Sequence, residues 1–183
     1  MSSGQLKNSF NTDPSEEEIS GFAEAARTGD SAAVVKFLDK YNAAVDVRHP
    51  AGWTSLTYAA WWGKQDIVGI LLAKGAVVNQ KDGIGCTPLM YAAQNGNKDI
   101  VEMLLESGAS VDVENKVDKT ALVLARESRR TEIVELLEQW PEMQRRRLAE
   151  KKKREMEAEL KVFSQGLNHP IPVRAPLKFP TSI

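Results

Sequence analysis

The sequence has little of what binds metals or forms disulfides. Its 183 residues contain one cysteine, Cys86, and two histidines, His49 and His169. A single cysteine cannot form a disulfide within the chain, which favours a reducing compartment. One cysteine and two distant histidines also cannot supply the ligands of a zinc site. We expect no metal and no cofactor.

Targeting and membrane segments are missing as well. The first ten residues lack the apolar stretch of a secretory signal. No apolar run approaches the roughly 20 residues that a membrane span needs. We therefore expect a soluble cytoplasmic protein without a membrane span, with the nucleus as a second candidate location.

Sequence motifs of enzymes are not found. No Gly-x-x-x-x-Gly-Lys-Ser/Thr loop is present, and Gly83-Ile84-Gly85 belongs to a predicted turn rather than to a phosphate-binding loop. Cys86 has no basic sequence neighbour that would activate it, so it is interpreted as a small packing residue. We predict that the protein is not an enzyme.

The charge is unevenly distributed along the chain. Residues 1–140 contain 14 Lys and Arg against 20 Asp and Glu, whereas residues 141–183 contain 10 against 5. An acidic body is thus followed by a basic tail, and the two parts are expected to have different roles.

An internal repeat decides the fold. The stretch 54–76 recurs with few changes at 87–109, an offset of 33 residues. A fixed period of this length is typical of stacked supersecondary units, which usually offer an extended binding face rather than a closed pocket. Four units are predicted, about 13–48, 49–81, 82–114 and 115–140.

Each unit is expected to form two short antiparallel helices. Thr54 and Thr87 are predicted helix caps, and Gly63 and Gly96 are predicted to end the helices that follow them. The first helix of the chain is expected to begin at Asp13, with Pro14 in its first turn.

At these residues the chain resembles the ankyrin repeat family. The pattern Gly-x-Thr-Pro-Leu, Ala-Ala-x-x-Gly, Ile-Val, Leu-Leu and Gly-Ala is matched closely within 49–79 and 82–112. The resemblance implies an all-α ankyrin-repeat solenoid of four helix–turn–helix units, followed by a charged C-terminal helix. It also implies a monomeric scaffold or adaptor that binds one or more intracellular proteins.

In that family, target contacts come mostly from the loop tips and from the two residues before the helix-ending glycine. The matching positions, which we name the inner surface, are Trp53, Trp61, Trp62, Arg27, Ile84, Gln94 and Asn95. Because tryptophan is enriched in binding hot spots, the three tryptophans are predicted to form one aromatic patch on the concave face. The alternative is that Trp61 or Trp62 packs onto the adjoining repeat.

Residues 141–165 are predicted to form a separate charged helix, because Pro141 disfavours helix at Trp140. Its basic residues are Arg145, Arg146, Arg147, Lys151, Lys152, Lys153 and Arg154. They fit a nuclear-import signal, a contact with an acidic surface, or a solvated extension of the last repeat. Interleaved acidic residues argue against specific binding of nucleic acid.

The ends of the chain are predicted to be disordered. Residues 1–12 are polar and unpatterned, and residues 166–183 are rich in proline. The final residues Thr181 and Ile183 fit the carboxyl-terminal signal captured by PDZ domains, although three residues often match by chance. An alternative function follows from the basic helix, in which the repeats anchor a regulatory subunit and the helix is its effector.

Overall fold

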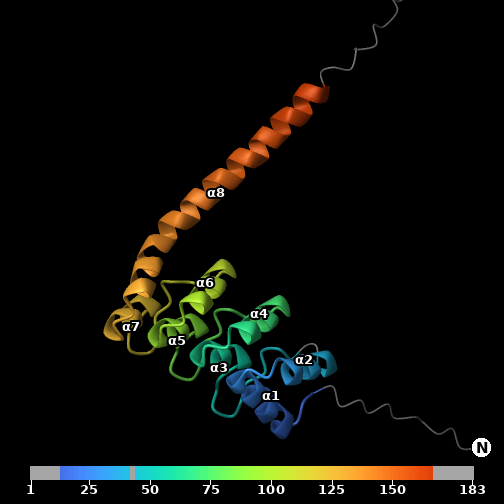
Figure 1. The fold of residues 1–183 in the computed structure, drawn as a ribbon, viewed down its shortest axis with the longest axis vertical. Helices are drawn as coiled ribbons and strands as arrows, with labels where there is room; N and C mark the ends of the chain where they lie inside the picture. The colour runs from blue at the N-terminus through green and yellow to red at the C-terminus, as the bar shows by residue number, and fades with distance from the viewer. Residues whose placement is uncertain (1–12, 42–43, 167–183) are drawn as a thin grey trace, which may run out of the picture. The chain divides into compact units, whose positions relative to one another are not determined.

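The computed structural model describes residues 13–41 and 44–166 (Figure 1). The chain divides into two units, Met1–Glu138 and Gln139–Ile183. The predictions of disorder for residues 1–12 and 167–183 lie outside the described residues, as does the carboxyl-terminal signal at Thr181 and Ile183.

The described ranges consist of helices, turns and one isolated β-bridge between Arg48 and Thr54. The helices are α1 (Glu16–Thr28), α2 (Ser31–Lys40), α3 (Ser55–Trp61), α4 (Gln65–Ala73), α5 (Pro88–Asn95), α6 (Lys98–Glu106), α7 (Ala121–Glu127) and α8 (Thr131–Gly166). They follow one another as four helix pairs, the last made of α7 and the start of α8. The all-α fold of four helix–turn–helix units is confirmed.

The start and stop residues predicted for the first helices of the two central repeats are confirmed. Thr54, Thr87 and Thr120 cap α3, α5 and α7, and each side chain accepts a hydrogen bond from the backbone N–H three residues later. Gly63 and Gly96 follow α3 and α5 with φ of +69° and +88°. This left-handed conformation lets the chain turn sharply into the next helix and favours glycine.

The helices of the first unit of the chain form two rows. α1, α3, α5 and α7 pack side by side in an inner row, and α2, α4 and α6 form an outer row (Figure 1). Fully buried alanine pairs, Ala59–Ala60 and Ala92–Ala93, allow the inner helices to approach closely. The outer helices bury large aliphatic side chains, namely Ile67, Val68, Leu71, Ile100, Val101, Leu104 and Leu105.

Polar side chains also join neighbouring helix pairs. Asn97, just before α6, donates from Nδ2 to the backbone carbonyl of Ala60 at 2.8 Å. Arg130, just before α8, donates from Nε to the backbone carbonyl of Gln94 at 3.1 Å. The last carbonyls of a helix lack a donor within that helix. Each of these side chains therefore caps the inner helix of the preceding pair.

The helix break expected at Trp140 is wrong, because α8 runs over Thr131–Gly166 with Pro141 inside it. A proline within a helix costs about 3 kcal/mol, since it lacks the backbone N–H. Residues 142–162 are mostly Glu, Lys, Arg, Met, Leu and Ala, which are strong helix formers. Their helix propensity offsets this cost, and the helix continues through Pro141. In the described ranges, no helix is long and apolar enough to cross a membrane.

The N-terminus of α1 is held by a capping box. Ser15 Oγ accepts a hydrogen bond from the Glu18 N–H at 3.3 Å, and the Glu18 carboxylate accepts from the Ser15 N–H at 3.0 Å. The sequence-based prediction placed the start of this helix at Asp13, but the cap is Ser15. The physical reason is reciprocal bonding, which needs a glutamate three residues after the cap.

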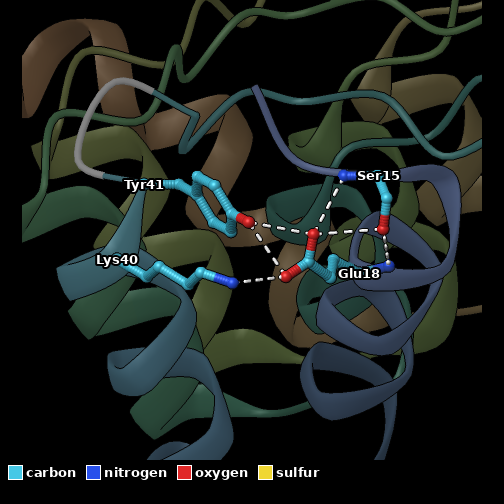
Figure 2. A network of polar contacts seen from close by, with 4 residues as sticks. All are labelled: Ser15, Glu18, Lys40 and Tyr41. Atoms are coloured by element: carbon cyan, nitrogen blue, oxygen red, sulfur yellow. Dashed lines mark hydrogen bonds and ion pairs between the residues drawn. The ribbon is translucent and has the colours of Figure 1, made fainter. Parts of the chain in front are cut away.

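The same carboxylate links α1 to the end of α2 (Figure 2). Lys40 Nζ lies 2.6 Å from Glu18 Oε1, and the Tyr41 hydroxyl donates to both carboxylate oxygens at 2.9 Å. The bond from Lys40, followed by those from the Ser15 backbone and Tyr41, lowers the pKa of Glu18 to about 2. The carboxylate in turn raises the pKa of Lys40.

Glu18→Gln should lower the midpoint temperature of thermal unfolding at neutral pH, because the amide keeps the shape of the side chain but loses its charge. A carboxyl group whose pKa falls on folding stabilises the native state above its unfolded pKa, which is about 4.3 for glutamate. That contribution is lost as the pH falls toward the folded pKa of about 2. Circular dichroism melts at several pH values should show a difference between wild type and variant that shrinks below about pH 5. A difference that does not change with pH would contradict the charged network.

Candidate functional site

Three tight turns of the same geometry precede α3, α5 and α7. They open at His49, Asp82 and Asn115, which we call the turn-acceptor residues. Each side chain accepts a hydrogen bond from the backbone N–H two residues later: Ala51 to His49 Nδ1 at 3.1 Å, Ile84 to Asp82 Oδ1 at 3.0 Å, and Val117 to Asn115 Oδ1 at 3.0 Å. The turns therefore hold their tips, including Ile84, in fixed positions.

Neighbouring turns are bonded to one another at the 33-residue period. Arg48 Nη2 donates to the backbone carbonyl of Lys81 at 2.9 Å. Lys81 Nζ in turn donates to the backbone carbonyl of Glu114 at 3.0 Å. The loop tips are thus a continuous, bonded edge of the helix stack.

Ile84 lies at the tip of the second turn with 59% of its surface exposed. Its carbonyl accepts a hydrogen bond from the backbone N–H of Lys116 in the next turn at 3.0 Å. This close approach needs Gly85, since a Cβ there would lie 3.0 Å from the Lys116 nitrogen. Ile84 is therefore an exposed apolar side chain on a rigid backbone.

Two of the three predicted tryptophans belong to one aromatic cluster. The ring centroids of Trp53 and Trp61 are 5.9 Å apart, and the Tyr91 ring lies 4.7 Å from Trp53 and 5.3 Å from Trp61. Tyr58 adds a further ring, 5.0 Å from Trp53. Tyr91 belongs to the next helix pair, so Trp53 and Trp61 pack between two neighbouring helix pairs. The sequence-based alternative of packing therefore holds for Trp61.

The two tyrosines are anchored by the turn-acceptor residues. The Tyr91 hydroxyl donates to Asp82 Oδ2, and the Tyr58 hydroxyl lies 3.2 Å from His49 Nδ1. Burial, followed by the hydrogen bond to Asp82, raises the pKa of Tyr91 well above its ordinary range. Burial also raises the pKa of Tyr58, with the charge of Glu24 as a smaller cause. Both hydroxyls therefore remain protonated donors.

Trp62 forms no ring contact with this cluster among the described residues, and the single patch of three tryptophans stays a prediction. Trp62 is 49% exposed, and the Arg27 guanidinium carbon lies 5.5 Å from its ring centroid. Arg27 is itself held by two hydrogen bonds to Glu24, at 2.5 and 2.7 Å. The bond to Glu24 raises the pKa of Arg27 and lowers that of Glu24. Trp61 is the last residue of α3, whereas Trp62 is the C-cap residue that follows the helix.

Gln94 and Asn95, the predicted neighbours of the tryptophans, lie at the end of α5. Both take part in hydrogen bonds between neighbouring helix pairs. Asn95 Nδ2 donates to the backbone carbonyl of Trp61 at 3.0 Å. The backbone carbonyl of Gln94 accepts from Arg130, while the Gln94 side chain is half-buried. Asn95 therefore links the end of α5 to the end of α3 at Trp61.

The inner surface presents aromatic faces, amides and one paired arginine. No group of three or more His, Cys, Asp or Glu that could hold a metal occurs among the described residues. Cys86 is buried, and the Asn115 amide donates to its sulfur at 3.3 Å, consistent with its interpretation as a packing residue.

The predicted basic residues lie on α8, in the unit Gln139–Ile183, where their side chains are exposed: Arg145, Arg146, Arg147, Lys151, Lys152, Lys153 and Arg154. Several form ion pairs along the helix. Arg146 pairs with Glu142 at 3.3 Å, and Lys151 and Lys153 pair with the glutamates four residues later at 3.8 and 3.9 Å. Arg147 lies over the Trp140 ring, 5.4 Å from its centroid.

The turn-acceptor residues and the two tyrosines hold the loop tips and the aromatic cluster in place, and sequence reasoning missed them. The signal was available, since residues 49, 82 and 115 recur at the 33-residue period and stand three before Gly52, Gly85 and Asp118. Those three residues all have positive φ, from +57° to +86°. A positive φ marks a tight turn, and tight turns recruit side-chain acceptors from polar residues.

Trp61→Ala should lower the free energy of unfolding by about 2 kcal/mol, because it removes ring contacts that join two helix pairs. Trp62→Ala should cost at most about 1 kcal/mol, the scale of an exposed cation–π contact. Urea denaturation of both variants measures the two values. Equal losses would contradict the division of the tryptophans into a packed ring and an exposed one.

Comparison with known proteins agrees with this geometry. A family model described as ankyrin repeats (3 copies) matches residues 5–82 and 78–144, which is more than half of the chain. A protein of Callithrix jacchus named ankyrin repeat, SAM and basic leucine zipper domain-containing protein 1 is 40% identical over 63 residues. That alignment covers 34% of this chain and 13% of the relative's length. With its stacked helix pairs, capped inner helices and bonded loop tips, the chain belongs to the ankyrin repeat family.

Proposed function

We propose that the protein binds a partner protein through the inner surface, with Trp62 as its centre. Ankyrin repeats generally mediate protein–protein interactions, and the exposed ring of Trp62 is the observation that supports this face. About half of its side chain is open to solvent, at 49%. Tryptophan is among the residue types most enriched in the hot spots of protein interfaces.

Trp62 is also held in place before any partner arrives. Arg27 covers part of its ring, and the two hydrogen bonds that Arg27 donates to the Glu24 carboxylate fix the arginine. A side chain that is already ordered loses less conformational freedom on binding. Tryptophan and arginine are the residue types most enriched in binding hot spots.

The remaining inner-surface residues support this centre. Trp53 and Trp61 form a rigid floor, because both rings pack on Tyr91. Ile84 adds an exposed apolar contact at the loop tip. The Gln94 amide is a polar group that can bond to the backbone of a bound segment.

The charges near this surface are balanced internally. Glu24 pairs with Arg27 at 2.5 Å, and Lys119 pairs with Glu127 at 2.7 Å. A highly charged partner would have to break these pairs. We therefore infer a partner segment that is mainly apolar, with backbone or amide groups for the polar contacts.

A second candidate function belongs to the unit Gln139–Ile183. Arg147, Arg154 and Lys161 recur every seven residues along α8, and Lys151 falls on the same side. At 3.6 residues per turn these four residues share one helix face, and no acidic residue falls within it. This stripe favours the alternative in which the basic helix acts on an acidic protein surface while the repeats anchor the protein.

The inner-surface proposal predicts that Trp62→Ala weakens partner binding by at least about 2 kcal/mol, the hot-spot range, or roughly thirtyfold. Affinity capture of intracellular proteins with wild type and variant, quantified by mass spectrometry, identifies the partners to be titrated. Val77→Ala is the matched control, since Val77 is also 49% exposed but lies outside the inner surface. Unchanged binding of every captured partner by a folded Trp62→Ala variant would overturn the proposal.

The stripe proposal is tested with two variants of equal charge. Glutamate at residues 147, 151, 154 and 161 reverses the stripe, and glutamate at residues 145, 146, 152 and 153 reverses the same number of charges elsewhere on α8. Only the stripe variant should lose its acidic partners, measured as retention on the captured proteins in a salt gradient. Equal losses would show that net charge, not the stripe, decides binding.

A further inference from the structure

The outer face of the first helix pair contains a hollow of about 380 Å³. Gly21 and Phe22 of α1 line one side, and Ala33, Lys36 and Phe37 of α2 line the other. The floor is aromatic, because the rings of Phe22 and Phe37 stack at 4.1 Å with an angle of 9° between their planes. This face is distinct from the inner surface.

At the hollow, the first helix pair differs from the later pairs in two equivalent positions. Eight residues before the left-handed turn, the later pairs bury Ser55, Pro88 and Ala121, whereas the first pair has the exposed Gly21. At the third position of the outer helix, the later pairs bury Ile67, Ile100 and Ile133, whereas the first pair has the half-buried Ala33. The first pair has the smallest side chain at both positions.

Both positions are buried in the three pairs that follow another described pair, and more open in the first pair, before which the structure describes no helix. We infer that these positions are covered when another helix pair precedes them. A terminal repeat usually presents a polar outer face to water. Here the floor stays aromatic, and space has been opened above it.

Gly21 has no local reason to be glycine. It lies inside α1, where glycine is less favourable than alanine, and its φ is not in the left-handed region. Apart from its chain neighbours and the backbone of α1 itself, no atom lies within 4 Å of the place its Cβ would occupy. Glycine on a helix surface allows another backbone to approach closely.

The two lysines at the rim of the hollow, Lys40 and Lys36, differ in whether they already form an ion pair. Lys40 is engaged by Glu18 and lies beside Tyr41, as Figure 2 shows. Lys36, one turn earlier on α2, is exposed and has no ion-pair partner within the described part of the chain. The hollow therefore combines an apolar floor with one unbalanced positive charge.

We propose that this face binds an α-helix of a partner protein, in the place that a preceding repeat would occupy. The partner helix inserts an apolar side chain between Gly21 and Ala33 and places a carboxylate beside Lys36. A helix is the occupant that fits, because α1 and α2 cover the corresponding face of the next pair. The positive rim specifies an acidic residue near the inserted apolar one.

The probe for this proposal is a phage-displayed library of alanine-rich helical peptides, randomised along one face and selected on the full chain. Enriched peptides should carry a large apolar residue with Asp or Glu three or four positions away, the spacing of one helix face. Binding of an enriched peptide is then measured by fluorescence anisotropy. Gly21→Leu, which fills the hollow, should weaken binding at least tenfold. Ala32→Leu, on an exposed position of α2 outside the lining, should not.

The charge is tested by exchange. Lys36→Glu should weaken the same peptide about tenfold, the effect of like charges in contact, and replacing the peptide's acidic residue by lysine should restore binding. Lys152→Glu on α8 is the matched control and should leave binding unchanged. Circular dichroism confirms that each variant is folded.

Several outcomes would overturn the proposal. Peptides without the apolar and acidic pair, or peptides that bind Gly21→Leu as tightly as wild type, would place binding elsewhere. Peptides that no longer bind the Trp62→Ala variant would be ligands of the inner surface instead. Binding that arises only after deletion of residues 1–12 would make this segment the occupant. Self-association abolished by Gly21→Leu, seen by analytical ultracentrifugation, would make a second copy the occupant.

Discussion

The structure depends on one constraint, which is that a single helix pair cannot bury its own apolar faces. Each pair must lie against a neighbour, so the contacts that stabilise it are contacts between consecutive pairs. Close packing at Ala59–Ala60 and Ala92–Ala93 is one expression of this constraint. The bond from Asn97 to the carbonyl of Ala60 is another, since a helix end is capped from the next pair.

Repetition of the backbone leaves individual positions free to differ in chemistry. The three turns have one geometry, yet their acceptor is a histidine, a carboxylate or an amide. His49 can accept from Ala51 only while Nδ1 carries no proton, whereas Asp82 and Asn115 have no such condition. The hollow at Gly21 and Ala33 arises in the same way, by smaller residues at positions that are buried in the other pairs.

The two adjacent tryptophans show how one sequence feature separates into two roles. Trp61 packs on Tyr91 of the next pair, and Trp62 lies half-exposed under Arg27. Both stand just before Gly63, so their place in the repeat does not distinguish them. Their contacts do, because Trp61 ends α3 and meets the Tyr91 ring, whereas Trp62 follows the helix and meets Arg27.

The sequence by itself determined the family, the period and the helix ends. These are local signals, carried by the 33-residue repeat, by caps such as Thr54 and Thr87, and by Gly63 and Gly96 at their left-handed turns. A local rule failed at Pro141, where helix continues in spite of the lost N–H.

Only the tertiary structure decided which tryptophan is packed and where the hollow lies. Glu18 reaches Lys40 and Tyr41 of the next helix, and Arg27 reaches a ring in the next pair. These contacts depend on how side chains of different helices meet in space. Periodicity places residues at equivalent positions, but it does not show which neighbours they touch.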